Sequence, residues 1–178
     1  MGIRTLISTS TASNAANVDI TSGIDSTYDE YMFVFTDIGP ATNQVAITFQ
    51  CSIDGGSNYN VTTTSTFFAA EHPEAAGGGA MGYETGADQA QGTAYQVLSG
   101  NIGNGSDESG AGILHLFSPA STTYVKHFYS TTQVYDANTR PKVAYVGGYF
   151  NDTNDVNAIS FKMASGNFDG VIQMYGIA

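Results

Sequence analysis

The sequence contains no tryptophan, a single cysteine (Cys51) and only five lysines and arginines among its 178 residues. A lone cysteine excludes an intramolecular disulfide and a cysteine-rich metal site. Because sixteen Asp and Glu give a formal net charge of −11, nucleic acid, which is bound mainly through cations, is not an expected partner. No apolar run approaches the ~18 residues of a membrane helix, and the N-terminus lacks the apolar core of a secretory signal. We therefore expect synthesis and folding in a cytoplasm, with no membrane anchor.

Charged residues of both signs are scarce, at 12% of the chain, about half the usual ~25%. Thr, Ser, Asn, Gln and Gly fill the polar positions instead. Protein interfaces are depleted in Lys and Glu, so this composition favours a protein that assembles with other proteins. The net acidity is accounted for by solubility alone.

A two-residue period dominates the chain. Val45, Ile47, Phe49 and Cys51 alternate with polar residues, as in a half-buried strand, and residues 31–36 are apolar on both faces, as in a central strand. Residues 60–68 are rich in β-branched side chains, which favour strands. Further strands are expected near Thr5–Thr9, Tyr95–Ser99, Gly112–Phe117, Val125–Val134, Val143–Phe150, Ala158–Met163 and Val171–Ile177.

Turn residues separate these strands, and no segment has a sustained helical stripe. Asp54–Ser57 predicts a hairpin, Asn151–Asp155 predicts a turn, and Glu71–Ala94 predicts a long excursion over one edge. About ten short strands without helices predict one all-β domain over residues 1–178, an antiparallel β-sandwich of jelly-roll type. The predicted core comprises Phe33, Phe35, Ile47, Phe49, Leu114, Leu116, Phe128, Val146, Phe161 and Ile172.

Few residues are spaced for chemistry. His115 and His127 have no second ligand two residues away, and His72, which has Glu74 at that spacing, is separated from it by Pro73. No nucleophile elbow is present. Cys51 is in phase with apolar neighbours, which predicts a buried and inert thiol.

Acidic turns offer the remaining candidates for a metal. Asp152 with Asp155, Asp107 with Glu108, and the turn at Asp54 are conceivable calcium ligands, but turns use such residues for their own hydrogen bonds. The glycine clusters at 77–79 and 103–105 lack the neighbouring cations of a phosphate site. The sequence therefore predicts no catalytic residue, no metal, no cofactor and no enzymatic activity.

Tyrosines supply one alternative function, carbohydrate binding. Sugar-binding sandwiches present exposed aromatic rings, and six tyrosines lie near expected strand ends or loops, although a buried ring with a solvated hydroxyl is the commoner role. These are Tyr28, Tyr31, Tyr59, Tyr83, Tyr95 and Tyr135.

Several strings, taken in order, resemble a known group of proteins. They are Tyr28-x-x-Tyr31, Ser52–Tyr59, Leu116–Thr123 with Lys126–Phe128, Gly147–Tyr149, Phe161–Phe168 and the ending Ile172–Ile177. Together they resemble small β-rich virion proteins of tailed phages, particularly marine ones, which act as capsid decoration (cement) proteins or tail-fibre components. The resemblance covers residues 28–177, implies no catalytic residues, and departs from the usual ending only by Ala178.

The function expected from the residues and the resemblance together is that of a capsid decoration protein in the virion. The alternative is a tail-fibre module that binds host glycans. The expected partners are the major capsid protein or other virion proteins and further copies of the chain. The choice of a homotrimer rests on the resemblance. Residues 1–20, with the small polar segment Thr9–Asn17, suggest an N-terminal arm that contacts a neighbour.

Overall fold

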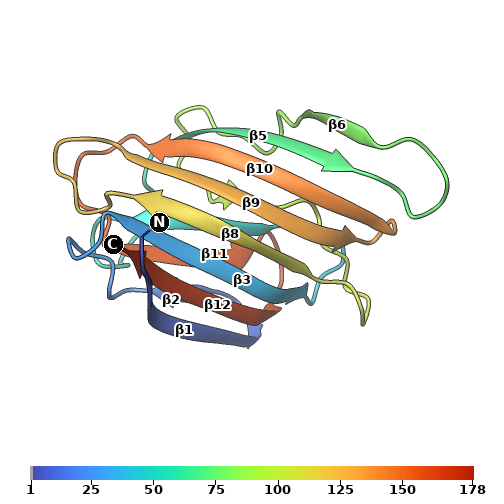
Figure 1. Cartoon of the computed structure of the whole chain (residues 1–178), viewed down its shortest axis with the longest axis horizontal. Helices are drawn as coiled ribbons and strands as arrows, with labels where there is room; N and C mark the ends of the chain where they lie inside the picture. Colours follow the sequence, from blue (N-terminus) through green and yellow to red (C-terminus); the bar gives the residue numbers. More distant parts are fainter. Residues whose placement is uncertain (1) are drawn as a thin grey trace.

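The computed structural model describes residues 2–178, which form strands and loops without a helix. Two antiparallel sheets stack face to face as a β-sandwich, which confirms the predicted fold class (Figure 1). Within residues 2–178 there is no helix long and apolar enough to cross a membrane.

The larger sheet has eight strands, in the order β1-β12-β3-β8-β9-β10-β5-β6. Figure 1 shows it nearest the viewer, with β1 along its lower edge and β6 at its upper edge. Its strands are β1 (Arg4–Ala15), β3 (Glu30–Pro40), β5 (Thr63–Glu71), β6 (Ala80–Tyr83), β8 (Gly110–Phe117), β9 (Lys126–Asp136), β10 (Arg140–Phe150) and β12 (Phe168–Ile177).

The smaller sheet has four strands, in the order β2-β11-β4-β7, and lies behind the larger one in Figure 1. Its strands are β2 (Val18–Ile20), β4 (Ile47–Ser52), β7 (Gln96–Val97) and β11 (Ala158–Met163). Pairing is nested along the chain, since β1 lies beside β12, β2 beside β11, and β5 beside β10. Such nesting arises when one long antiparallel ribbon is wrapped across two sheets, as in a jelly roll.

Aromatic rings fill the space between the sheets. Phe49 of β4 lies with its ring centre 5.0 Å from Phe128, 5.8 Å from Phe150 and 6.3 Å from Phe161. The ten residues of the predicted core are all buried, none more than 3% exposed, so the predicted inward faces are confirmed. Cys51 is also fully buried, as predicted, and its burial raises the pKa of the thiol.

The strand prediction differs from the structure mainly at the short edge strands. Every expected strand is present, but β2 and β6 were not predicted, because three or four residues are too few to show a period. The strand expected over 31–36 extends to Pro40 through a bulge at Asp37, whose φ is 53°.

One of the two loop predictions was wrong. The turn at Asp54–Ser57 does form, with φ of 72° at Gly55 and 88° at Gly56, but it connects β4 of the small sheet to β5 of the large sheet and is not a hairpin. The excursion after Glu71 does lie at one edge of the large sheet, as expected. It forms β6 and then folds back against β5, where the amide of Ser65 donates to Gln89 O at 2.9 Å.

The N-terminal segment is a strand along most of its length. Residues 4–15 form β1 and pair with β12, while within residues 2–178 no strand pairs with the other edge of β1.

Truncation of Phe49 tests this packing. We expect Phe49→Ala to lower the free energy of unfolding by about 3–5 kcal/mol, because a fully buried ring with three aromatic neighbours is removed. Urea denaturation measures the change. Phe68→Ala is the matched control and should cost clearly less, since Phe68 is 44% exposed. A loss below about 1 kcal/mol for Phe49→Ala would contradict the packing described here.

Candidate functional site

The outward side of the eight-stranded sheet is the most distinctive surface of the chain. Because side chains alternate along each strand, the residues that face away from the small sheet form rows across paired strands. One row runs Tyr175–Met32–His115–Tyr129–Gly147–Thr66, and the next runs Gln173–Val34–Ile113–Thr131–Tyr145–Phe68–Tyr83. We call these two rows, together with Glu30, Ala70, Met81, Ala111, Phe117, His127, Gln133, Val143 and Tyr149, the outer face.

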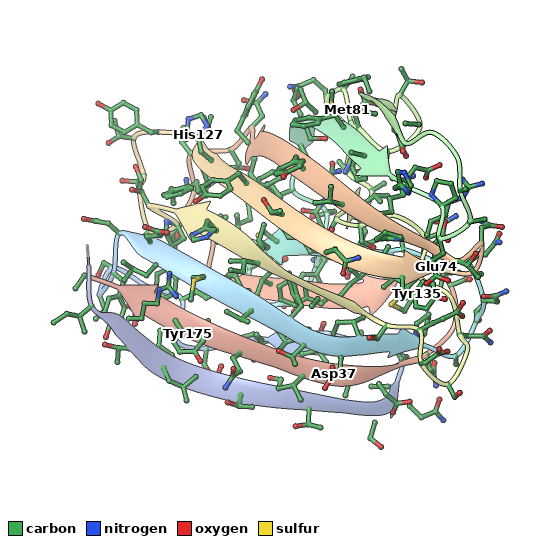
Figure 2. The ribbon with its side chains drawn as sticks, turned by 45° about the vertical axis from the view of Figure 1, so that its right-hand side comes forward. Asp37, Glu74, Met81, His127, Tyr135 and Tyr175 are labelled. Carbon is green, nitrogen blue, oxygen red and sulfur yellow. The ribbon has the colours of Figure 1, made fainter. Side chains whose placement is uncertain are left out.

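Exposed apolar side chains concentrate on this surface. Eight large hydrophobic residues of the described chain are exposed, and five of them belong to the outer face, while a sixth, Leu6, extends the first row onto β1. The five are Phe68, Met81, Tyr83, Tyr129 and Tyr145. Figure 2 labels Tyr175, His127 and Met81, which come from β12, β9 and β6 and span the sheet. A monomeric protein rarely exposes a continuous patch of this kind without a use for it.

The rings of the outer face stack on one another across strands. His115 and Tyr129 lie 4.6 Å apart between ring centres with 17° between their planes. Phe68 and Tyr145 lie 5.0 Å apart at 15°. Each stacked ring covers one face of its neighbour, so a ligand can reach only the other face and the edges of these rings.

The outer face is almost free of charge. Its only carboxylate is Glu30, whose Oε1 lies 2.5 Å from Nδ1 of His115. The two residues are not on one strand, and it is the pairing of β3 with β8 that brings them together. Spacing along a single strand therefore does not predict this pair.

One end of the large sheet is acidic. Asp37, Asp107, Glu108 and Asp169 line a common depression of about 410 Å³ beside the end of β3. No basic residue lines it, so this end supplies negative charge at the border of an otherwise neutral surface.

A second, polar cleft of about 440 Å³ lies where β5 and β10 meet the loop before β7. Two of the five basic residues of the chain are here: Arg140 Nη1 contacts Glu71 Oε1 at 2.6 Å, and Lys142 Nζ contacts Glu84 Oε1 at 2.6 Å. Asp136 also lines the cleft, but its Oδ1 accepts hydrogen bonds from the turn amides of Asn138 and Arg140. The charged groups of the cleft thus largely satisfy one another.

The tyrosines expected to form a sugar platform are dispersed. Tyr31 is fully buried, with its hydroxyl donating to Asp25 O, so this candidate was wrong. Tyr28 packs edge-on against Tyr31, and the ring of Tyr95 lies under Lys162 Nζ at 4.0 Å. Tyr59 and Tyr135 are half-buried in separate places, and only Tyr83 belongs to the outer face. The exposed tyrosines of the central strands, Tyr129 and Tyr145, were not predicted, although the same two-residue period indicates them.

The other candidate residues occupy ordinary structural positions. His72 and His127 are exposed, and the ring of His127 meets that of Tyr149 edge-on. The acidic side chains of these turns accept hydrogen bonds from amides of the same turn. Asp152 Oδ1 accepts a hydrogen bond from the amide of Asn154 at 2.7 Å, and Glu108 Oε2 accepts one from the amide of Gly105 at 2.6 Å. Within residues 2–178, no three His, Cys, Asp or Glu side chains are grouped to hold a metal ion.

Lys126 is fully buried, which the sequence did not indicate. Its Nζ donates to the carbonyl oxygen of Asp152 at 3.2 Å, and burial lowers the pKa of the amine. The nearby carboxylates of Asp152 and Asp155 oppose that shift. We assign Lys126 the role of holding the loop that connects β10 to β11.

Comparison with protein-family models, with curated proteins and with solved structures finds no match to this chain. The resemblance to phage virion proteins therefore rests on the strings quoted above.

The turn at Asp54 gives a prediction about pH. Hydrogen bonds from the side chains of Asn58 and Ser52 and the amide of Asn58 lower the pKa of Asp54 from 3.8 to about 2. A carboxylate whose pKa is lower in the folded state stabilises the fold above pH 3.8, and this contribution disappears as the pH falls through about 2. We expect Asp54→Ala to lower the melting temperature at neutral pH, and the difference from the unmodified chain to shrink below pH 3.8 and to disappear below about pH 2.

Thermal denaturation over that pH range measures the effect. Asn58→Ala, which removes the largest cause of the shift, should show the same dependence with a smaller amplitude. A difference that stays constant across the acid range would show that the carboxylate has no such bonds in solution.

Proposed function

We propose that this chain is a non-enzymatic structural protein of a phage virion, a capsid decoration protein that docks on the assembled shell through its outer face. The observation that carries the proposal is the outer face itself: a neutral, aromatic surface on a chain of net charge −11. Low charge density lowers the desolvation cost of docking, and exposed Tyr, Phe and Met are the residues that protein interfaces favour.

The stacking of the rings supports a protein partner over a glycan. A sugar ring packs on the open face of an aromatic side chain, whereas in His115–Tyr129 and in Phe68–Tyr145 one face of each ring is already covered by its partner. Ring edges with apolar neighbours such as Ile113 and Val143 suit the interdigitation of side chains from another protein. Glycan binding by a tail-fibre module remains the alternative function, and copy number in the particle separates the two.

The acidic depression indicates what the partner offers. A shell surface that meets the outer face should be apolar at its centre and should present lysine or arginine toward Asp37, Asp107, Glu108 and Asp169. Such complementary charge would orient the docked protein and raise its rate of association. The phage resemblance implies that this partner surface of the shell belongs to the major capsid protein, and that the docked copies form groups of three.

A single exposed residue tests the docking surface. Thr131 lies at the centre of the outer face, so Thr131→Lys places a charge in the middle of the interface without disturbing the core. We expect this variant to bind at least about tenfold more weakly to particles of the source phage from which the gene for this chain has been deleted. Cosedimentation with the particles measures the affinity.

The matched control is Asn60→Lys, an exposed position in the loop between β4 and β5, which should bind as the unmodified chain does. Quantification in intact particles should give hundreds of copies, as the resemblance to decoration proteins implies. Equal binding by both variants would overturn docking through the outer face, and a few dozen copies or fewer would favour the tail-fibre alternative.

A further inference from the structure

The two sheets have four edge strands, which differ greatly in length. Three of them are very short: β6 has four residues, β2 has three and β7 has two. The fourth edge strand is β1, which has twelve residues. Short edge strands are one of the ways in which proteins prevent unwanted pairing, so β1 stands apart from the other three.

Proline and charge, two further forms of edge protection, are missing from most of β1. From Thr5 to Ala15 it contains no proline and no charged residue, and most of its side chains are small. The strand does contain two bulges, at Ile7 and at Ser13–Asn14. Between them, residues 8–12 pair regularly with Met174–Gly170 of β12 and leave a regular free edge.

From this geometry we infer that the free edge of β1 pairs with β1 of a second copy of this chain, antiparallel and about a two-fold axis at Ser10. The first irregular residue on each side, Ile7 or Ser13, is three residues from Ser10, so the regular segment 8–12 is centred on that residue. In this pairing Thr9 of each copy lies opposite Thr11 of the other, and the two copies of Ser10 lie opposite each other. Opposed threonines are favourable cross-strand neighbours, and the small side chains allow the backbones to approach.

Charge at the ends of β1 favours the same arrangement. Arg4, at the start of the strand, is its only charged residue. At the other end, the amide of Asn14 donates to Oδ1 of Asp169 at 2.8 Å. Antiparallel pairing about Ser10 places Arg4 of each copy opposite Ala16 of the other, one strand away from Asp169 on β12. The two arginines thus lie toward the acidic ends of the partner strands and offset part of the repulsion between two acidic chains at long range.

The dimer would join the two large sheets into one, with both outer faces on the same side. Two docking surfaces held together bind a repeating shell more tightly than one, because the second contact becomes intramolecular. The pairing itself does not depend on the phage proposal. It is a two-fold contact, unlike the three-fold grouping that the resemblance implies, and it uses residues outside the outer face.

Charge-swapped variants at Thr9 and Thr11 test the inference, because both side chains are exposed and substitution should not affect folding. In sedimentation velocity over a concentration series, the unmodified chain should dimerise. Thr9→Lys/Thr11→Lys and Thr9→Glu/Thr11→Glu should each dimerise at least about tenfold more weakly, since like charges then face each other. An equimolar mixture of the two should regain dimers that contain one copy of each.

The control is Thr131→Lys/Gln133→Lys, which adds the same two charges at exposed positions of β9 on the same side of the sheet and should dimerise normally. The inference is overturned if the unmodified chain is monomeric at every concentration, if trimers are its only oligomer, or if the control loses dimers while the β1 variants keep them. Failure of docking through the outer face would instead appear only in particle binding.

Discussion

The alternation of side chains along the strands of the large sheet is the constraint on which the rest of the molecule depends. On β9, Phe128 and Val134 enter the core, while Tyr129, Thr131 and Gln133 face outward. Residues that are paired across neighbouring strands point to the same side of the sheet. The alternation is therefore continuous from β12 to β6 and produces a buried face and an outer face together. The outer face is therefore as regular as the core, which is why its aromatic residues fall into rows.

The unequal size of the two sheets explains most of the remaining structure. The four-stranded sheet covers only part of the eight-stranded sheet, and at Ser65 the inner side of β5 meets the loop between β6 and β7, whose Gln89 amide donates to Ser65 Oγ at 2.9 Å. Buried amides stabilise that loop: Gln50 Nε2 donates to the carbonyl oxygens of Val61, Thr93 and Ala94, and Gln96 Oε1 accepts from Ser65 Oγ at 2.6 Å. The polar cleft around Lys142 lies beside this loop, so the unequal size of the two sheets accounts for the cleft as well.

The sequence is sufficient to predict the fold class and the core, because both depend on the local two-residue period around residues such as Phe49 and Leu114. It is not sufficient for features that depend on which strands are neighbours. The pairing of His115 with Glu30, the crossing of Asp54–Ser57 between sheets and the burial of Lys126 all require the topology. Tyr31 shows the converse error, since its position near a turn suggested exposure, but an apolar neighbourhood and a hydrogen bond to Asp25 bury it.

The central claim is that the outer face is a protein-binding surface in a phage particle. A cryo-electron microscopy reconstruction of the source particle tests it most directly, because it locates every copy and shows its orientation. If docking occurs as proposed, copies lie on the shell with Tyr129, Tyr145 and Phe68 buried against another protein and with the four-stranded sheet turned to solvent. Copies whose outer face is open to solvent, or particles that lack the chain, would contradict it.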